Sequence, residues 1–148
     1  MEDVFQKLIL MIRAYYPVLY LHSYEYYRTK QKIKGIVELL RREGKKVNYY
    51  QWDCVYGLVQ ILPDKTEKRI ERMQNPLEVL AYILNSKKSG EKNIFVLDDI
   101  NNHIDRDEVK LMFRKIAEAT NNNTHAIILS SIYRLPAELE KYITVLQI

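Results

Sequence analysis

The chain has 148 residues, of which 47% are hydrophobic and 28% are charged, and its formal net charge is +4. This length suits one domain over residues 1–148, and the composition excludes wholesale disorder. The chain has one cysteine, a charged start and no apolar run near the ~20 residues of a membrane span, so we expect a cytoplasmic or organelle-interior protein without internal disulfides or membrane contact.

Apolar patterns along the chain predict alternating helices and strands. Spacings of three and four residues are typical of amphipathic helices, and short apolar runs are typical of buried strands. The first half predicts a helix at 3–14 packed against the edge or end of the sheet, a strand at 17–21, a helix ending at Gly44, a strand at 47–52, an antiparallel edge strand at 57–62 and a charged loop at 63–72. The second half predicts a helix capped by Asn75 and opened by Pro76, a strand at 94–97, a helix capped by Asp105 and Glu108 and ended by residues 121–123, a strand at 126–129, a short helix from Pro136 to about Tyr142 and a strand at 143–148.

Strands that are apolar throughout and alternate with helices indicate a parallel sheet covered on both faces. We therefore predict an α/β fold, a three-layer sandwich around a mainly parallel five-stranded sheet. Comparison with nucleotide hydrolases of the phosphate-loop class implies the strand order 5-1-4-3-2.

The segment from the first buried strand into the next helix lies where such a hydrolase places its phosphate loop. Here the turn at residues 22–25 contains no glycine, and no Gly-Lys-Ser/Thr sequence stands at the start of the helix. Without glycines the backbone N–H groups cannot close around phosphate oxygens. The architecture thus indicates a nucleotide-hydrolase fold, whereas the turn argues against the chemistry.

An acidic pair, Asp98 and Asp99, follows the strand at 94–97. Nucleotide hydrolases use such a pair to hold Mg²⁺ and to orient the attacking water, and a polar residue such as Ser130 after the next strand commonly senses the terminal phosphate. Because the phosphate cradle is missing, we interpret Asp98, Asp99 and Ser130 as relics of a nucleotide site that now hold neighbouring loops in place. Residual binding of Mg-ATP and an ordinary strand-end turn remain the alternatives. The spacing around His103 fits neither a calcium nor a zinc motif, so we expect no metal site and no catalytic residue.

Tyrosines are concentrated in the first part of the chain, where nine of the twelve precede residue 57. Tyrosine belongs to sheet flanks and to protein interfaces, and beside basic residues it can stack on nucleobases. We choose Tyr24, Tyr26 and Tyr27 as candidate partner-binding residues. A protein partner is favoured over nucleic acid, because the basic residues of the helix fall on the arc expected to face solvent.

Several segments match one family in order over nearly the whole chain: Arg13–Tyr20, Tyr24–Glu25 with Arg28, Trp52 with Gly57–Leu58, Asn75–Leu80, Phe95–Asp99, Leu129–Ser131 and Leu135–Leu146. In these segments the chain resembles the amino-terminal region of AAA-type ATPases from plastids and cyanobacteria. In that family the region looks like a degenerate AAA-type module without a phosphate loop, followed by an intact ATPase module. The resemblance implies an ATPase partner, in the same chain or as a separate subunit, and transfers no catalytic residue.

The sequence therefore predicts a non-catalytic pseudo-ATPase module that serves as an amino-terminal regulatory or assembly domain. We expect it to need no cofactor, and oligomer formation is compatible with this role. Two alternatives stay open. One is a domain that still binds Mg-ATP through Asp98 and Asp99, and the other is a basic module that binds single-stranded nucleic acid.

Overall fold

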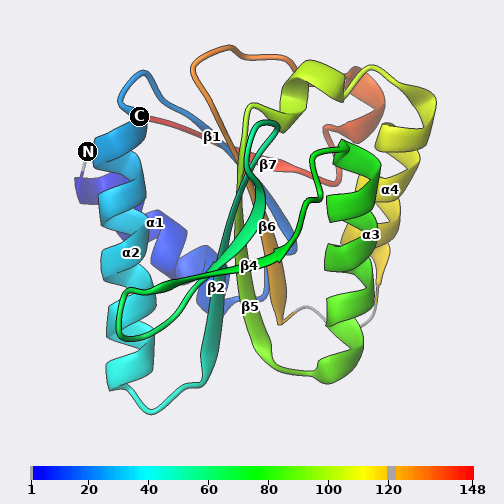
Figure 1. Ribbon diagram of the computed structural model, residues 1–148. Helices are drawn as coiled ribbons and strands as arrows, with labels where there is room; N and C mark the ends of the chain where they lie inside the picture. Colours follow the sequence, from blue (N-terminus) through cyan, green and yellow to red (C-terminus); the bar gives the residue numbers. More distant parts are fainter. Residues whose placement is uncertain (1, 120–122) are drawn as a thin grey trace.

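The computed structural model describes residues 2–119 and 123–148, and it shows helices on both sides of a central sheet (Figure 1). Its helices are α1 (Glu2–Arg13), α2 (Tyr26–Arg42), α3 (Pro76–Ser86) and α4 (Asp107–Glu118), with short 3₁₀ turns η1 (Lys87–Ser89), η2 (Ile100–His103) and η3 (Ala137–Leu139). Its strands are β1 (Val18–His22), β2 (Val47–Asp53), β3 (Gly57–Ile61), β4 (Glu67–Glu71), β5 (Lys92–Asp98), β6 (Thr124–Ser130) and β7 (Thr144–Gln147).

Within the described residues the sheet has seven strands in the order β4-β3-β2-β5-β6-β1-β7, so the prediction of five strands is wrong. The neighbours from β2 to β7 are all parallel, and they follow the predicted order. At one end β3 and β4 add antiparallel pairs. The fold is therefore α/β with a mixed sheet.

Strand β4 occupies the segment that we predicted as a charged loop. Its residues are almost all exposed, and its backbone pairs with β3. Charged side chains are typical of an edge strand, where they discourage pairing with another chain. The segment therefore lacks the apolar pattern of a strand, and it places β3 inside the sheet instead of at its edge.

Each face of the sheet is covered by a pair of helices. On one face Leu8 and Ile12 of α1 lie in the same apolar cluster as Ile33 of α2 and Leu21 of β1. Helix α1 thus packs beside α2 on a face, as Figure 1 shows, and the prediction that it packs against the edge or end of the sheet is wrong. The opposite cluster joins α3 and α4 to the other face, and it includes Phe95, whose ring is stacked 4.4 Å from the ring of Tyr50.

One helix start agrees with its sequence signal and another does not. The side chain of Asn75 accepts a hydrogen bond from the backbone N–H of Leu77 at 3.0 Å, so the predicted cap of α3 is confirmed. Helix α4 begins only at Asp107, and Asp105 does not cap it, because the chain first forms η2 and buries Ile104. The side chain of Glu108 instead accepts a hydrogen bond from Arg106.

Two other helix ends differ from their predictions. Pro136 is followed by the single turn η3, where we predicted a helix through about Tyr142. Helix α4 ends at Glu118, and residues 121 and 122 of the predicted terminator lie outside the described residues.

The parallel strands end together at one edge of the sheet, which we call the carboxyl edge (the upper side of Figure 1). The backbone N–H of Ile148 donates to the carbonyl oxygen of His22 at 3.0 Å, so residue 148 also lies at this edge. None of the described helices is long and apolar enough to cross a bilayer.

Candidate functional site

The turn between β1 and α2 is short and closed by its own side chains. Ser23 is fully buried, and its backbone N–H donates to the carbonyl oxygen of Ser130 at 2.9 Å. The Ser23 hydroxyl lies 2.9 Å from the hydroxyl of Thr29 and accepts the backbone N–H of Glu25 at 3.1 Å. The Ser23 hydroxyl and the N–H groups of Ser23 and Glu25 are thus directed to internal partners, and the turn has no glycine that would open it around a phosphate.

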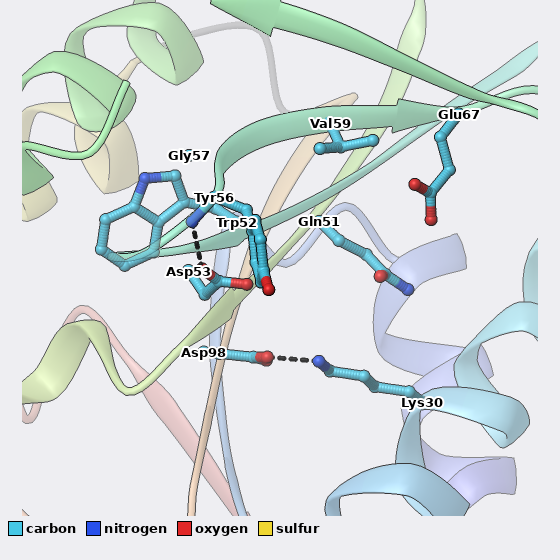
Figure 2. Close-up of a pocket in the computed structure, with 9 residues that line it drawn as sticks. All are labelled: Lys30, Gln51, Trp52, Asp53, Tyr56, Gly57, Val59, Glu67 and Asp98. Carbon is cyan, nitrogen blue, oxygen red and sulfur yellow. Dashed lines mark hydrogen bonds and ion pairs between the residues drawn. The ribbon is translucent and has the colours of Figure 1, made fainter. Parts of the chain in front are cut away.

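Asp98, at the end of β5, forms an ion pair with Lys30 of α2 (Figure 2). Both side chains are largely buried, with exposed fractions of 16% for Asp98 and 25% for Lys30. Burial raises the pKa of Asp98, and the Lys30 ammonium opposes this shift. A cation of the chain itself therefore lies against one of the two carboxylates that would hold Mg²⁺ and water in a nucleotide hydrolase.

Asp99 is held by two hydroxyl groups. Tyr26 donates its phenolic hydrogen to Oδ1 of Asp99, and Ser130 donates to the same oxygen at 2.9 Å. The pKa of Tyr26 is raised by burial and by this hydrogen bond to a carboxylate. The tyrosine hydroxyl also accepts the backbone N–H of Ser131 at 3.2 Å, so Asp99 is connected through Tyr26 to the loop after β6.

The structure brings together the sequence candidates Asp98, Asp99 and Ser130, and it separates the three tyrosines. Tyr24 and Tyr27 are 76% and 77% exposed, whereas Tyr26 is half-buried against Asp99. Neighbouring positions of a helix point about 100° apart, so Tyr26 and Tyr27 meet different surroundings although they are adjacent in sequence.

Lys30 is the functional residue that sequence reasoning missed, because we placed it on the solvent arc of its helix. Its contact with Asp98 follows from the topology: α2 starts at the carboxyl edge and connects β1 to β2, which lies beyond β6 and β5. A lysine one turn into this helix therefore reaches the end of β5. The predicted strand order indicated that the helix passes the end of this strand, but not which of its polar residues meets Asp98.

A cavity of about 260 Å³ lies between α2, β5 and the β2–β3 hairpin, beside the Lys30–Asp98 pair (Figure 2). Three carboxylates, from Asp53, Glu67 and Asp98, line it together with the one ammonium group of Lys30. This excess of negative charge repels phosphate groups. In the described part of the chain, no cluster of three or more His, Cys, Asp or Glu side chains has an arrangement that would hold a metal ion.

Comparison with known proteins identifies the family. The sequence model of the SpoVK-like AAA ATPase N-terminal domain matches residues 4–148. The chain belongs to this family. This confirms the AAA-type resemblance found in the sequence.

Two curated relatives of this SpoVK-like domain share the name "Uncharacterized AAA domain-containing protein ycf46". The protein from Trieres chinensis is 27% identical over 142 residues, which are 95% of this chain and 27% of the relative. The protein from Guillardia theta is 27% identical over 139 residues, which are 93% of this chain and 26% of the relative. The chain thus spans about a quarter of the length of these relatives.

Proposed function

We propose that this SpoVK-like N-terminal domain is a non-catalytic pseudo-ATPase module that regulates or assembles an AAA-type ATPase. Its fold would be that of a degenerate phosphate-loop hydrolase. The ATPase module would lie in the same polypeptide or in a separate subunit, and the domain itself would use no cofactor and would work in the cytoplasm or an organelle interior.

The observation that carries this proposal is that internal donors engage both carboxylates of the acidic pair. The ammonium of Lys30 occupies the Oδ2 atom of Asp98, so Mg²⁺ would have to displace it from that oxygen and would be repelled by it at the other oxygen. The Oδ1 atom of Asp99 already accepts hydrogen bonds from Tyr26 and Ser130. The pair thus holds structural elements together where an active hydrolase would hold metal and water.

The groups around the acidic pair are also unsuited to binding phosphate. Nucleotide hydrolases bind phosphate through backbone N–H groups and a lysine directed at the ligand. In this domain the turn at residues 23–25 is closed, and Lys30 is directed at Asp98. The neighbouring cavity has more carboxylates than cations.

One observation favours the alternative of residual Mg-ATP binding. The Oδ1 atom of Asp98 is buried and has no hydrogen-bond partner among the described residues. An uncompensated carboxylate oxygen is the kind of group that a cation would satisfy.

Calorimetric titration with ATP and Mg²⁺ separates the two functions. We expect no binding tighter than about 1 mM, which corresponds to roughly −4 kcal/mol. The variants Asp98→Asn and Asp107→Asn serve as a matched pair, because the side chain of Asp107 is 98% exposed on α4. Sub-millimolar binding that disappears in Asp98→Asn and persists in Asp107→Asn would contradict the proposal and establish the alternative.

A further inference from the structure

Large apolar side chains are exposed at the carboxyl edge, in the loop and first turn of α2 after β1 and in the loop after β6. Tyr24 and Tyr27 follow β1, and Ile132 and Tyr133 follow β6, with Ile132 52% and Tyr133 48% exposed. We call these four side chains, together with the half-buried His22 between the loops, the aromatic edge. Tyrosine and isoleucine side chains that lie this open on adjacent loops are characteristic of a surface that another molecule covers.

Ring contacts join three members of the aromatic edge, His22, Tyr24 and Tyr133. The His22 ring lies 5.4 Å from the ring of Tyr24 and 5.9 Å from that of Tyr133. Tyr133 in turn lies 5.6 Å from the ring of the buried Tyr20. The loops after β1 and β6 are therefore coupled through side chains as well as through the neighbouring strands.

Hydrogen bonds fix the loop after β6 in place. The Tyr20 hydroxyl donates to the carbonyl oxygen of Ile132 at 2.6 Å and accepts the backbone N–H of Arg134 at 3.0 Å. His22 donates from Nε2 to the carbonyl oxygen of Ser131 at 3.0 Å, and the N–H of Ser131 donates to Tyr26. Because Asp99 holds Tyr26, the relic acidic pair helps to fix this surface before a partner arrives. A pre-ordered surface loses little conformational entropy on binding.

The family description indicates which module covers the aromatic edge. Ile148 bonds to the backbone of His22, which belongs to this surface. The matched family is described as an N-terminal domain, and about three quarters of each curated relative lies outside the region that this chain matches. In a protein of that layout, a module that follows this domain in the chain starts beside the aromatic edge. A short linker gives such a module an effective concentration in the millimolar range, so a small patch is enough to bind it.

We propose that the aromatic edge is the docking surface for the AAA ATPase module of a SpoVK-like AAA ATPase. This inference rests on the proposed function and adds the surface through which it works. Nucleic acid is the less suitable partner, because Arg28 beside Tyr27 lies 3.8 Å from the carboxylate of Glu25, which offsets its charge.

Hydrogen exchange measured by mass spectrometry tests this proposal. The chain ending at residue 148 would be compared with the full-length protein that contains this domain and the ATPase module. We expect exchange at residues 24–28 and 131–134 to be at least about tenfold slower in the full-length protein, because docking excludes water from these loops. Exchange around Tyr15, an exposed tyrosine before β1 at the opposite edge of the sheet, should be the same in both proteins.

Matched variants connect the protection to the side chains. The double variant Tyr24→Asn/Tyr27→Asn should lose the protection, because removal of interface aromatic residues typically weakens binding tenfold or more. Tyr15→Asn is the control, since Tyr15 is also exposed and its φ of 66° suits asparagine. Both variants change exposed positions, and the emission of buried Trp52 would verify that each is folded.

The other outcomes overturn the inference in distinguishable ways. Protection on a different face would refute this docking surface and leave the proposed function intact, and protection on no face would refute both. Binding of a labelled single-stranded oligonucleotide at low salt that is lost in the double variant would assign the aromatic edge to nucleic acid instead. Mg-ATP calorimetry tests the non-catalytic role independently of all three results.

Discussion

Replacing Lys30 by methionine removes the ammonium group from Asp98 and keeps most of the apolar stem of the side chain. Breaking a buried ion pair costs about 3–5 kcal/mol, and an exposed pair contributes about 0–1 kcal/mol. Because the side chains of Lys30 and Asp98 are 25% and 16% exposed, the pair lies nearer the buried limit. We therefore expect Lys30→Met to lower the free energy of unfolding by about 2–3 kcal/mol at neutral pH.

The pH dependence gives this loss a signature. Burial already raises the pKa of Asp98, and removing Lys30 takes away the interaction that opposes the rise. With a folded-state pKa above the unfolded value, the penalty for a buried carboxylate is present at neutral pH and disappears as Asp98 binds a proton on acidification. The deficit of Lys30→Met relative to wild type should thus shrink as the pH falls from 7 toward 4.

Urea unfolding followed by fluorescence measures the effect, because Trp52 is the single tryptophan and is 2% exposed. A loss of this size moves the midpoint by about 1–2 M for a small domain. Adding Asp98→Asn to Lys30→Met should restore part of the stability, since it removes the unpaired charge. Lys34→Met, one turn further along α2, is the control, because no ion pair of Lys34 occurs among the described residues. Equal stabilities of Lys30→Met and Lys34→Met would refute the reasoning.

Three further predictions concern the supporting structure. Tyr26→Phe should lose about 2 kcal/mol in urea unfolding, because it removes hydrogen bonds to a carboxylate and a backbone N–H, whereas Tyr27→Phe should stay within about 0.5 kcal/mol of wild type. Burial lowers the pKa of His125 to about 3. Between about pH 6.5 and that value only the unfolded chain binds the proton, so the free energy of unfolding should decrease by about 1.4 kcal/mol for each unit that the pH is lowered. His125→Gln should flatten this pH dependence in urea unfolding. Gly57→Ala should lower the thermal midpoint more than Gly44→Ala, because both have positive φ but only an added Cβ at residue 57 meets a backbone nitrogen, at 3.0 Å; equal shifts would contradict this account.

The parallel part of the sheet could be predicted because its central strands β1, β5 and β6 are buried on both faces. In β6, for example, every residue is buried, and the corresponding apolar run is visible in the sequence. Strand β4 escaped detection because its stability comes from backbone pairing with β3 and not from apolar burial. Hydrophobic periodicity reports only which side chains are buried, so it does not reveal a strand whose side chains are charged and exposed.

The sequence predicted which residues of the candidate site lie close together, but it did not predict which side chains bind them. Asp98, Asp99 and Ser130 follow strands whose ends share one edge, so their proximity follows from the topology. The sequence did not show that Lys30 and Tyr26 neutralise and bind the two carboxylates, because helical periodicity only separates an apolar face from the rest. Which polar residue of α2 meets β5 depends on how the helix lies across the sheet.

The acidic pair is engaged by the chain itself, and a crystal structure determined in the presence of ATP and Mg²⁺ tests this most directly. We predict that Lys30 remains on Asp98, that Tyr26 and Ser130 remain on Asp99, and that the turn at residues 23–25 binds no phosphate. Triphosphate oxygens seated beside Ser23, with Mg²⁺ on Asp98 and Lys30 displaced toward the phosphates, would contradict it.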